Sequence, residues 1–167
     1  MKKLAPSSVV VSLTVIAAAA ALGALLGAVA QAEIPHHTVV RADDIKWGAA
    51  PPSLPPGAQA AVLYGNPQQE GPFVLRLKFP AGFLIPPHRH SKDELVTVIS
   101  GKVAIMHGEK VDRAALQLLS PASFVHLPAG MPHYAAAEVE SVVQINSVGP
   151  FDVMYINPAD DPRTRKQ

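Results

Sequence analysis

The sequence predicts an all-β fold, a single-domain jelly-roll barrel preceded by an N-terminal arm. Between residues 73 and 79, aromatic and aliphatic side chains alternate with Arg76 and Lys78, as in a strand with one buried face. Leu95 to Ile99 is rich in β-branched residues, which favour strands. About eight to ten such short segments occupy less than 100 residues, and closure into a barrel leaves few exposed strand edges.

The chain is expected to consist of four segments: a cleaved signal peptide at 1–32, a proline-rich arm at 33–60, a barrel at 61–157 and a polar tail at 158–167. Lys2 and Lys3 precede an apolar run that ends in Ala30-Gln31-Ala32, a small-x-small cleavage pattern. A single membrane anchor is the competing interpretation, since the run approaches the ~20 residues that span a bilayer. We favour cleavage because the run is rich in Ala and Gly and no positive charges follow it.

No Arg-Arg pair precedes the apolar run, so Sec-type export to the periplasm or beyond is expected, with no membrane association after cleavage. Any metal would then be acquired outside the cytoplasm, because the site exists only in the folded chain. His36 and His37 lie in the arm and, being adjacent, cannot share one strand face.

Composition narrows the function classes. The 167 residues suit one domain with a modest core. The 14 basic and 13 acidic residues give no electrostatic case for binding nucleic acid. Cysteine is absent, which excludes disulfides, a thiol nucleophile and thiolate metal ligands.

The strand pattern continues along the barrel segment. Ser100-Gly101 is expected to form a hairpin turn between Leu95–Ile99 and a strand at Lys102–His107. The stretch from Val111 to Leu119 suits either a short helix, with Asp112 as its cap, or a strand. The remaining expected strands are Ala61–Gly65, Phe124–Leu127, His133–Ala137, Ser141–Ser147 and Asp152–Ile156, and the tail from Asn157 is expected to fray.

The stretch from Gly82 to Gly101 carries the candidate chemistry. His88 and His90 are two residues apart, so an extended strand turns both imidazoles to one face and Arg89 to the other. Pro86 and Pro87 keep this segment out of a helix. Imidazole together with a carboxylate such as Glu94 suits Zn, Mn, Fe, Ni, Co or Cu, whereas an isolated His-x-His pair is often only two solvated histidines.

The pattern Gly82-x5-His88-x-His90-x3-Glu94-x6-Gly101 resembles the first motif of the cupin family, and Pro128-x-Gly130-x2-His133 resembles the core of the second. The resemblance implies a jelly-roll barrel with one divalent transition metal held by His88, His90, Glu94 and His133. The second motif departs from the family pattern at Ala122, where glycine is usual, and at Ala137, where asparagine is frequent. Neither position is a metal ligand in the family.

Other polar side chains have plain structural explanations. His107 is expected to be a solvated residue at a strand end, and His126 a packed residue or a neighbour of the ligands rather than a fifth ligand. The faces of Gln144 and Tyr64 stay open, and the larger apolar side chains are expected in the core: Phe83, Met106 and Met154. No interior Arg or Lys is apparent to bind an anionic substrate, which favours a neutral, apolar-lined pocket.

Two functions stay open at this point. The first is a metal-dependent enzyme, an oxygenase acting on a small neutral or aromatic compound, with Glu94 as the catalytic candidate because a carboxylate ligand can dissociate or accept a proton. The second is a non-catalytic protein that binds metal or a small ligand, in which Glu94 is only a fixed ligand. By analogy with small cupins, whose arms often pack on a partner barrel, a homodimer is one expected assembly.

Overall fold

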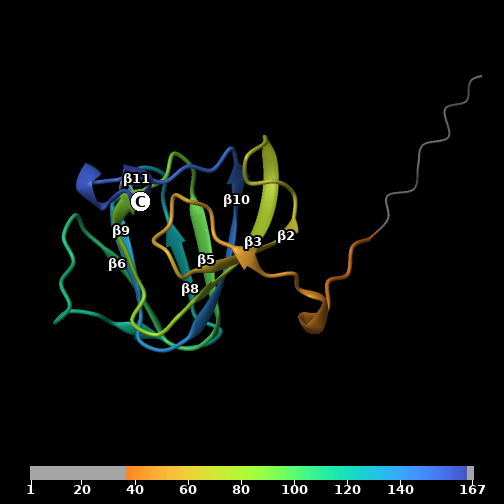
Figure 1. Cartoon of the computed structure of the whole chain (residues 1–167), viewed down its shortest axis with the longest axis horizontal. Helices are drawn as coiled ribbons and strands as arrows, with labels where there is room; N and C mark the ends of the chain where they lie inside the picture. Colours follow the sequence, from red (N-terminus) through yellow and green to blue (C-terminus); the bar gives the residue numbers. More distant parts are fainter. Residues whose placement is uncertain (1–36, 165–167) are drawn as a thin grey trace, which may run out of the picture. The chain divides into compact units, whose positions relative to one another are not determined.

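The computed structural model describes residues 37–164, and these form two antiparallel β-sheets of a jelly roll (Figure 1). The predicted fold class is therefore confirmed. In the six-stranded sheet the order is β1 (Gly48–Ala49), β2 (Gln59–Tyr64), β3 (Gly71–Phe79), β10 (Ser141–Gly149), β5 (Glu94–Ser100) and β8 (Phe124–Leu127). In the five-stranded sheet the order is β11 (Met154–Tyr155), β4 (Leu84–Arg89), β9 (His133–Ala137), β6 (Val103–His107) and β7 (Leu118–Leu119).

The inner faces of the two sheets supply the core. On β3 the predicted alternation is confirmed, since its aromatic and aliphatic side chains are buried while Arg76 and Lys78 lie on the outer face. Arg76 donates a hydrogen bond to Gln144 on the neighbouring strand β10 (3.1 Å). Burying each large apolar side chain contributes roughly 1.5–3 kcal/mol, so the pattern favours this register. The cluster draws on both sheets and includes Phe73, Leu75, Leu77, Phe79, Ile85, Val96, Val103, Val143 and Ile145.

The expected hairpin at Ser100-Gly101 is wrong. β5 pairs with β10 and β8, whereas β6 pairs with β9 and β7, so the chain passes from one sheet to the other at Gly101. Gly101 has φ +82°, and a Cβ at this position would overlap Ser141 Oγ and Glu140 O. A glycine is required here for close approach and backbone conformation, not for a two-residue hairpin.

Ala122 retains the turn geometry of the glycine that the cupin pattern would have. Its φ is +71°, and its N–H donates to Val98 O at 2.9 Å. A left-handed conformation costs a residue with a Cβ roughly 1–2 kcal/mol. The departure from the motif is thus absorbed as backbone strain rather than as a different turn.

Residues 111–119 form a loop that ends in the two-residue strand β7. Asp112 Oδ1 accepts hydrogen bonds from the backbone N–H groups of Ala114 (3.0 Å) and Ala115 (3.3 Å). Of the two expected structures only a short strand is found, and Asp112 caps a turn that does not continue as a helix.

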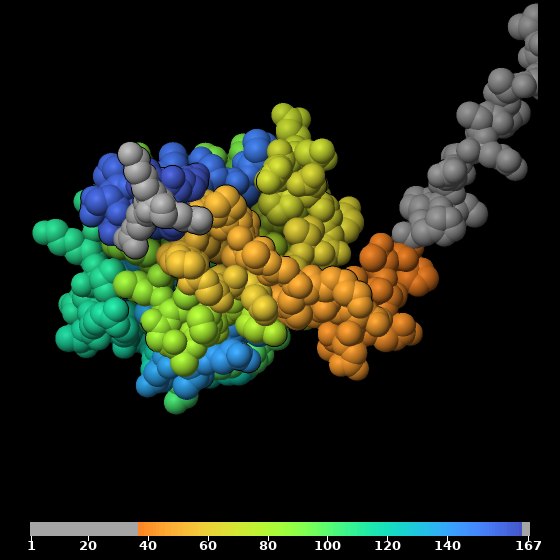
Figure 2. All heavy atoms as spheres, viewed as in Figure 1, coloured from red at the N-terminus to blue at the C-terminus, as the bar shows by residue number. Residues whose placement is uncertain are grey.

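The proline-rich part of the arm packs against the barrel of its own chain. Ala50 and Leu54 pack against the core cluster, and Tyr155 on β11 donates its hydroxyl to Ser53 O (2.7 Å). Earlier in the arm, η1 (Ala42–Asp44) is a single 3₁₀ turn, and Lys78 Nζ lies 4.6 Å from the centre of the Trp47 ring. Figure 2 shows the segment around residues 50–58 lying on the surface of the barrel strands.

As far as Thr164, where the described residues end, the tail does not show the expected fraying. It forms two 3₁₀ turns, η2 (Pro158–Asp160) and η3 (Pro162–Thr164). Asn157 caps η2 through its side chain, and Arg163 makes a bidentate ion pair with Asp161, both contacts at 2.8 Å. Arg163 also donates to Val153 O (2.9 Å), which fastens the tail to the barrel.

The predicted signal peptide and His36 lie outside the described residues. Among residues 37–164 no helix has the length and apolar character needed to cross a membrane.

Candidate metal centre

His88 and His90 come from the end of β4. His88 lies within the strand and His90 one residue beyond it, and both side chains are buried while Arg89 between them is exposed. The two-residue spacing therefore turns both imidazoles inward, as predicted. Pro86 and Pro87 fall where the pairing of β4 with β9 shifts register, a position that needs no donated hydrogen bond from them.

His133 and Glu94 reach the same point from two other strands. His133 begins β9 and faces His88 directly in the β4–β9 pairing. Glu94 begins β5, in the opposite sheet, and its side chain is turned inward with Val96 and Val98. The structure thus brings together all four residues that the cupin resemblance implies.

The four side chains form one buried cluster. The ligand nitrogens of the three histidines lie within 4.8 Å of one another. Glu94 Oε2 lies 3.4 Å from His90 Nε2 and 3.3 Å from His133 Nε2. Each of the four residues is no more than 6% exposed, so the cluster is shielded from bulk water.

The backbone fixes which nitrogen each imidazole offers. The Nδ1 atom of each histidine faces a backbone carbonyl: Pro86 O for His88 (2.7 Å), Asp152 O for His90 (2.5 Å) and Met131 O for His133 (3.0 Å). A carbonyl only accepts, so each Nδ1 carries the proton and each Nε2 keeps its lone pair.

The free lone pairs fit a metal ion. His90 Nε2 and His133 Nε2 are buried and have no hydrogen-bond partner, since Glu94 Oε2 lies close to both but at poor geometry. A carbonyl on Nδ1 and an unpartnered Nε2 is the usual arrangement of a metal-bound histidine. The buried histidine cluster is consistent with one metal ion.

The charge states follow from burial and from the neighbours. Burial, together with the positive charge that His133 and His90 can carry, lowers the pKa of His88 to about 3, so His88 is neutral at physiological pH. Burial alone would raise the pKa of Glu94, but the close imidazoles of His133 and His90 outweigh it and hold this pKa at about 2. Burial also opposes the charge on His90, yet its contact with Glu94 raises its pKa overall.

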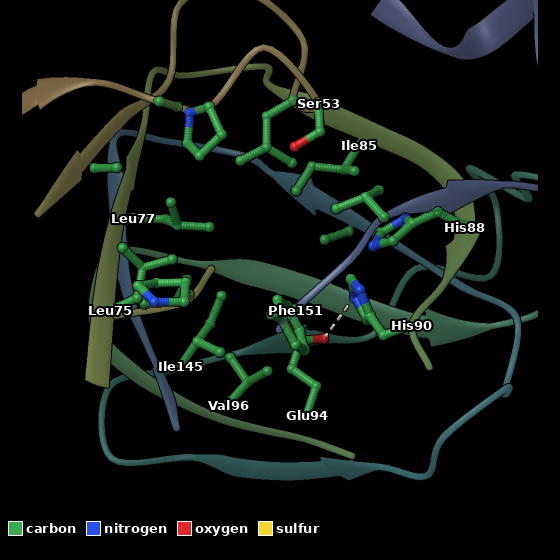
Figure 3. A pocket seen from close by; sticks show the side chains of 18 of the residues that line it. Ser53, Leu75, Leu77, Ile85, His88, His90, Glu94, Val96, Ile145 and Phe151 are labelled. Atoms are coloured by element: carbon green, nitrogen blue, oxygen red, sulfur yellow. Dashed lines mark ion pairs between the residues drawn. The ribbon is translucent and has the colours of Figure 1, made fainter. Parts of the chain in front are cut away.

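The cluster lies in a cavity of about 690 Å³ inside the barrel. Figure 3 shows His88, His90 and Glu94 turned toward one another at one end, and the aliphatic side chains of Leu75 and Leu77 at the other. The aliphatic lining comes from both sheets, and the proline-rich arm contributes Pro51, Ser53 and Leu54 on one side. A cavity with few polar groups and one polar cluster suits a small, mostly apolar ligand.

The two other histidines of the barrel, His107 and His126, lie outside this cavity. His107 is exposed at the end of β6, as expected, and His37 is exposed in the arm. His126 is not packed beside the ligands as expected. It lies on the outer face of β8, with its side chain 48% exposed, and pairs with Asp93 at 3.1 Å.

The side chains whose faces stayed open point away from the cavity. Gln144 is on the outer face of β10, where it accepts the hydrogen bond from Arg76, and Tyr64 is exposed. Phe83 is in the core as expected, stacked on Phe79 at 5.0 Å, whereas Met154 is 37% exposed.

Sequence reasoning missed several residues at the site. Phe151 lines the cavity and stacks on His90, and Asp152 accepts the His90 hydrogen bond through its backbone. Arg163 also lines the cavity, so an Arg is present there, although its charge is paired with Asp161. The Gly-Pro pair before Phe151 marks the end of a strand, but no sequence signal indicates which strand the following residues reach.

The structure thus places a buried histidine cluster between the two sheets of a jelly roll. This structure is similar to the polyketide cyclase RemF from Streptomyces resistomycificus, with 16% identity over 76% of this chain and 90% of that one (TM-score 0.60). It is also similar to an acetylacetone dioxygenase from Acinetobacter johnsonii, with 17% identity over 77% and 82% of the two chains (TM-score 0.57). A cupin-2 domain protein from Rhodospirillum rubrum has 16% identity over 76% and 85% (TM-score 0.55).

At these identities the likenesses establish the cupin fold. The chain belongs to the family described as domain of unknown function DUF4437, whose model matches residues 38–165. Comparison with curated protein sequences found no significant match.

Proposed function

We propose that this protein is a metal-dependent cupin enzyme of the oxygenase type that acts on a small neutral or aromatic compound. The observation that carries the proposal is the buried cluster of His88, His90, Glu94 and His133 at one end of an apolar cavity. A functional site is expected where buried polar groups converge inside an otherwise apolar pocket.

The donor set indicates the class of metal. Three imidazoles and one carboxylate suit Fe, Mn, Ni, Co, Cu or Zn. Such an ion, when bound, supplies Lewis-acid or dioxygen chemistry, and any of these except tetrahedral zinc can keep a position open beside four protein ligands. The protein's own part is to hold the His88 imidazole neutral and the Glu94 carboxylate ionised in a site from which bulk water is excluded.

The cavity lining indicates the class of substrate. Apart from the cluster itself, the lining residue with a formal charge is Arg163, and its guanidinium is paired with Asp161. Arg76, Lys78 and Arg89 lie outside the cavity lining. An anionic substrate would lose its hydration in this cavity without gaining an unpaired positive charge, whereas a neutral compound would replace water along the aliphatic lining.

Two relatives in structure have names that agree with this class. One is a polyketide cyclase and another an acetylacetone dioxygenase, and both names refer to compounds with ketone groups. Because one fold hosts many activities, these names guide the choice of test compounds and no more.

A non-catalytic binding protein is the second candidate. Glu94 Oε2 lies within 3.4 Å of two histidine nitrogens, next to the group of three histidines that could hold an ion. Four protein ligands around zinc form a saturated tetrahedron, as in structural sites. Glu94 would then be a fixed ligand with no catalytic part.

We also propose that the protein is exported by a Sec-type route and works outside the cytoplasm. Lys2, Lys3, the apolar run after them and Ala30-Gln31-Ala32 support this. N-terminal sequencing of the native protein should find Glu33 first, and a chain that keeps Met1 would contradict it.

Metal analysis followed by a dioxygen-uptake screen tests the function. Protein from the native compartment should contain about one transition-metal ion per chain, and uptake should rise with a neutral diketone or a phenol. The His133→Ala protein is the matched control, and it should show neither metal nor uptake. A stoichiometric metal with no uptake or product for any compound would favour the binding protein.

A further inference from the structure

Of the three histidines in the cluster, His90 is the one that lies outside the regular strand pairing. His88 and His133 lie in the β4 and β9 ladders and face each other in register. β4 ends at Arg89, so His90 lies one residue beyond the regular pairing. Its backbone accepts one hydrogen bond, from Gly130 N–H to His90 O (2.8 Å), and a backbone bond does not set the side-chain torsions of the imidazole.

Two neighbouring residues hold this imidazole instead. The ring of Phe151 stacks on the ring of His90, with centroids 4.4 Å apart and planes inclined by 21° (Figure 3). The backbone carbonyl of Asp152 accepts the hydrogen bond from His90 Nδ1 (2.5 Å). The stacked ring defines the plane of the imidazole and the carbonyl defines its rotation within that plane. Together they direct His90 Nε2 toward Glu94, 3.4 Å away.

The residues that hold His90 are themselves well fixed. Phe151 donates its N–H to Pro67 O (2.8 Å), and its ring packs edge-on against Phe73 at 5.3 Å. The carboxylate of Asp152 accepts the N–H of Ser91 (2.7 Å), which ties the chain just after His90 to the same unit. His90 and Ser91 thus meet Phe151 and Asp152 at three contacts, across about 60 residues of sequence.

We propose that Phe151 is a positioning residue of the metal centre, which sets the orientation of His90 through ring stacking. The proposal rests on the metal site proposed above. Because Phe151 also lines the cavity, its ring is the surface that a ligand beside the metal would touch. The same ring therefore connects the occupancy of the cavity with the geometry of a metal ligand.

The test compares two substitutions of Phe151 with Co²⁺ alone as the probe. Phe151→Leu keeps an apolar side chain but removes the flat face, whereas Phe151→Tyr keeps the ring. Loss of a group that orients a metal ligand typically weakens metal binding about 10–100-fold. We expect that loss, with an altered visible absorption spectrum of the bound Co²⁺, for Phe151→Leu, and we expect Phe151→Tyr to retain the affinity and spectrum of the natural protein. Phe151→Met, which also fills the space without a flat face, should behave like Phe151→Leu and serves if that variant does not fold.

Phe83→Leu is the matched control. Phe83 is buried and stacked on Phe79 at an angle of 9°, but it is absent from the cavity lining. The Phe83→Leu substitution should lower the melting temperature without changing the affinity for Co²⁺ or the absorption spectrum of the bound ion. If Phe151→Leu kept the Co²⁺ affinity and spectrum of the natural protein, the proposal would be overturned. An equal loss of affinity in Phe83→Leu would also overturn it, because the loss would then reflect general destabilisation. If the natural protein binds no Co²⁺, the metal site itself fails, and this result is distinct from the other two.

Discussion

Two histidine–carboxylate pairs, one exposed and one buried, meet where β5 begins. Asp93 immediately precedes β5 and Glu94 begins it, and each pairs with a histidine at a similar distance, 3.1 Å for His126 and 3.4 Å for His90. The side chains of the outer pair are 48% and 60% exposed, whereas those of the inner pair are 5% and 8% exposed. The chemistry of the two pairs is the same, and their surroundings differ.

That difference decides what each pair can do. In the outer pair water screens the charges, and the contact contributes little to stability or binding. In the inner pair burial works against both charges, and the pair persists because a second histidine, His133, also contacts Glu94. The inner pair can therefore bind a ligand in a place that is shielded from water, whereas the outer pair cannot.

The largest expected difference between the pairs is in metal content. His88→Ala or His133→Ala should remove stoichiometric metal, with a loss beyond the roughly 10–100-fold that follows from losing a group hydrogen-bonded to a ligand. His126→Ala and His37→Ala should leave the metal content unchanged. Elemental analysis of the purified variants measures this, and full metal in the His88 variant would place the site elsewhere.

The next effect is on turnover. Glu94→Gln keeps the shape of the side chain but removes its charge and basicity, so an enzyme should keep much of its metal and lose turnover about 100-fold or more. Asp93→Asn makes the same change on the outer face and should retain turnover. Steady-state assays with a compound from the uptake screen, together with metal analysis, measure both. Undiminished turnover in Glu94→Gln would reject a catalytic role for Glu94.

The third effect is on stability against pH in the metal-free protein. Because the pKa of His88 falls from 6.5 to about 3 on folding, the unfolded chain binds a proton that the folded chain does not, and stability decreases as pH falls from about 6.5 toward 3. The full difference corresponds to roughly 5 kcal/mol. His90 works in the opposite sense, since its raised pKa adds stability that is present below 6.5 and is lost as pH rises through the folded-state value.

The free energy of unfolding, measured with urea at a series of pH values, should therefore fall less steeply between pH 6.5 and 3 in His88→Asn than in the natural protein. An unchanged profile in this variant would show that His88 is not the buried neutral group that the structure indicates.

The smallest effect is expected for His126→Gln, which breaks the outer pair. Its melting temperature should stay close to that of the natural protein, because an exposed ion pair contributes little. A large fall, measured by circular dichroism, would mean that the outer pair has a structural role comparable to that of the inner one.

Local patterns in the sequence predicted the parts of the site that depend on local geometry. The spacing of His88 and His90 fixed their common face, and the motif around Gly130 indicated His133. The alternation in β3 predicted its buried face because a strand repeats every two residues. These features depend on backbone periodicity and short turns, which neighbouring residues determine.

The missed features depend on contacts between distant segments. A hairpin between β5 and β6 was expected because Ser100-Gly101 is a turn signal. The pairing partners of the two strands lie elsewhere in the chain. His126 on β8 pairs with Leu95, and Glu94 on β5 pairs with Leu127. Only this pairing between strands shows that Glu94 faces inward and His126 outward. Phe151 reaches His90 through tertiary packing, for which local propensity carries no information.

The origin of the cluster in both layers has a mechanical consequence. Glu94 belongs to the six-stranded sheet and His88 and His133 to the five-stranded sheet, and no strand in the described part of the chain is shared between the two. An ion bound by all of these side chains would act as a cross-link between sheets that are otherwise joined by turns and apolar packing. Amide hydrogens in β4, β5 and β9 should then exchange more slowly, and by a similar factor, once the ion is bound, because opening either sheet requires release of the same ion.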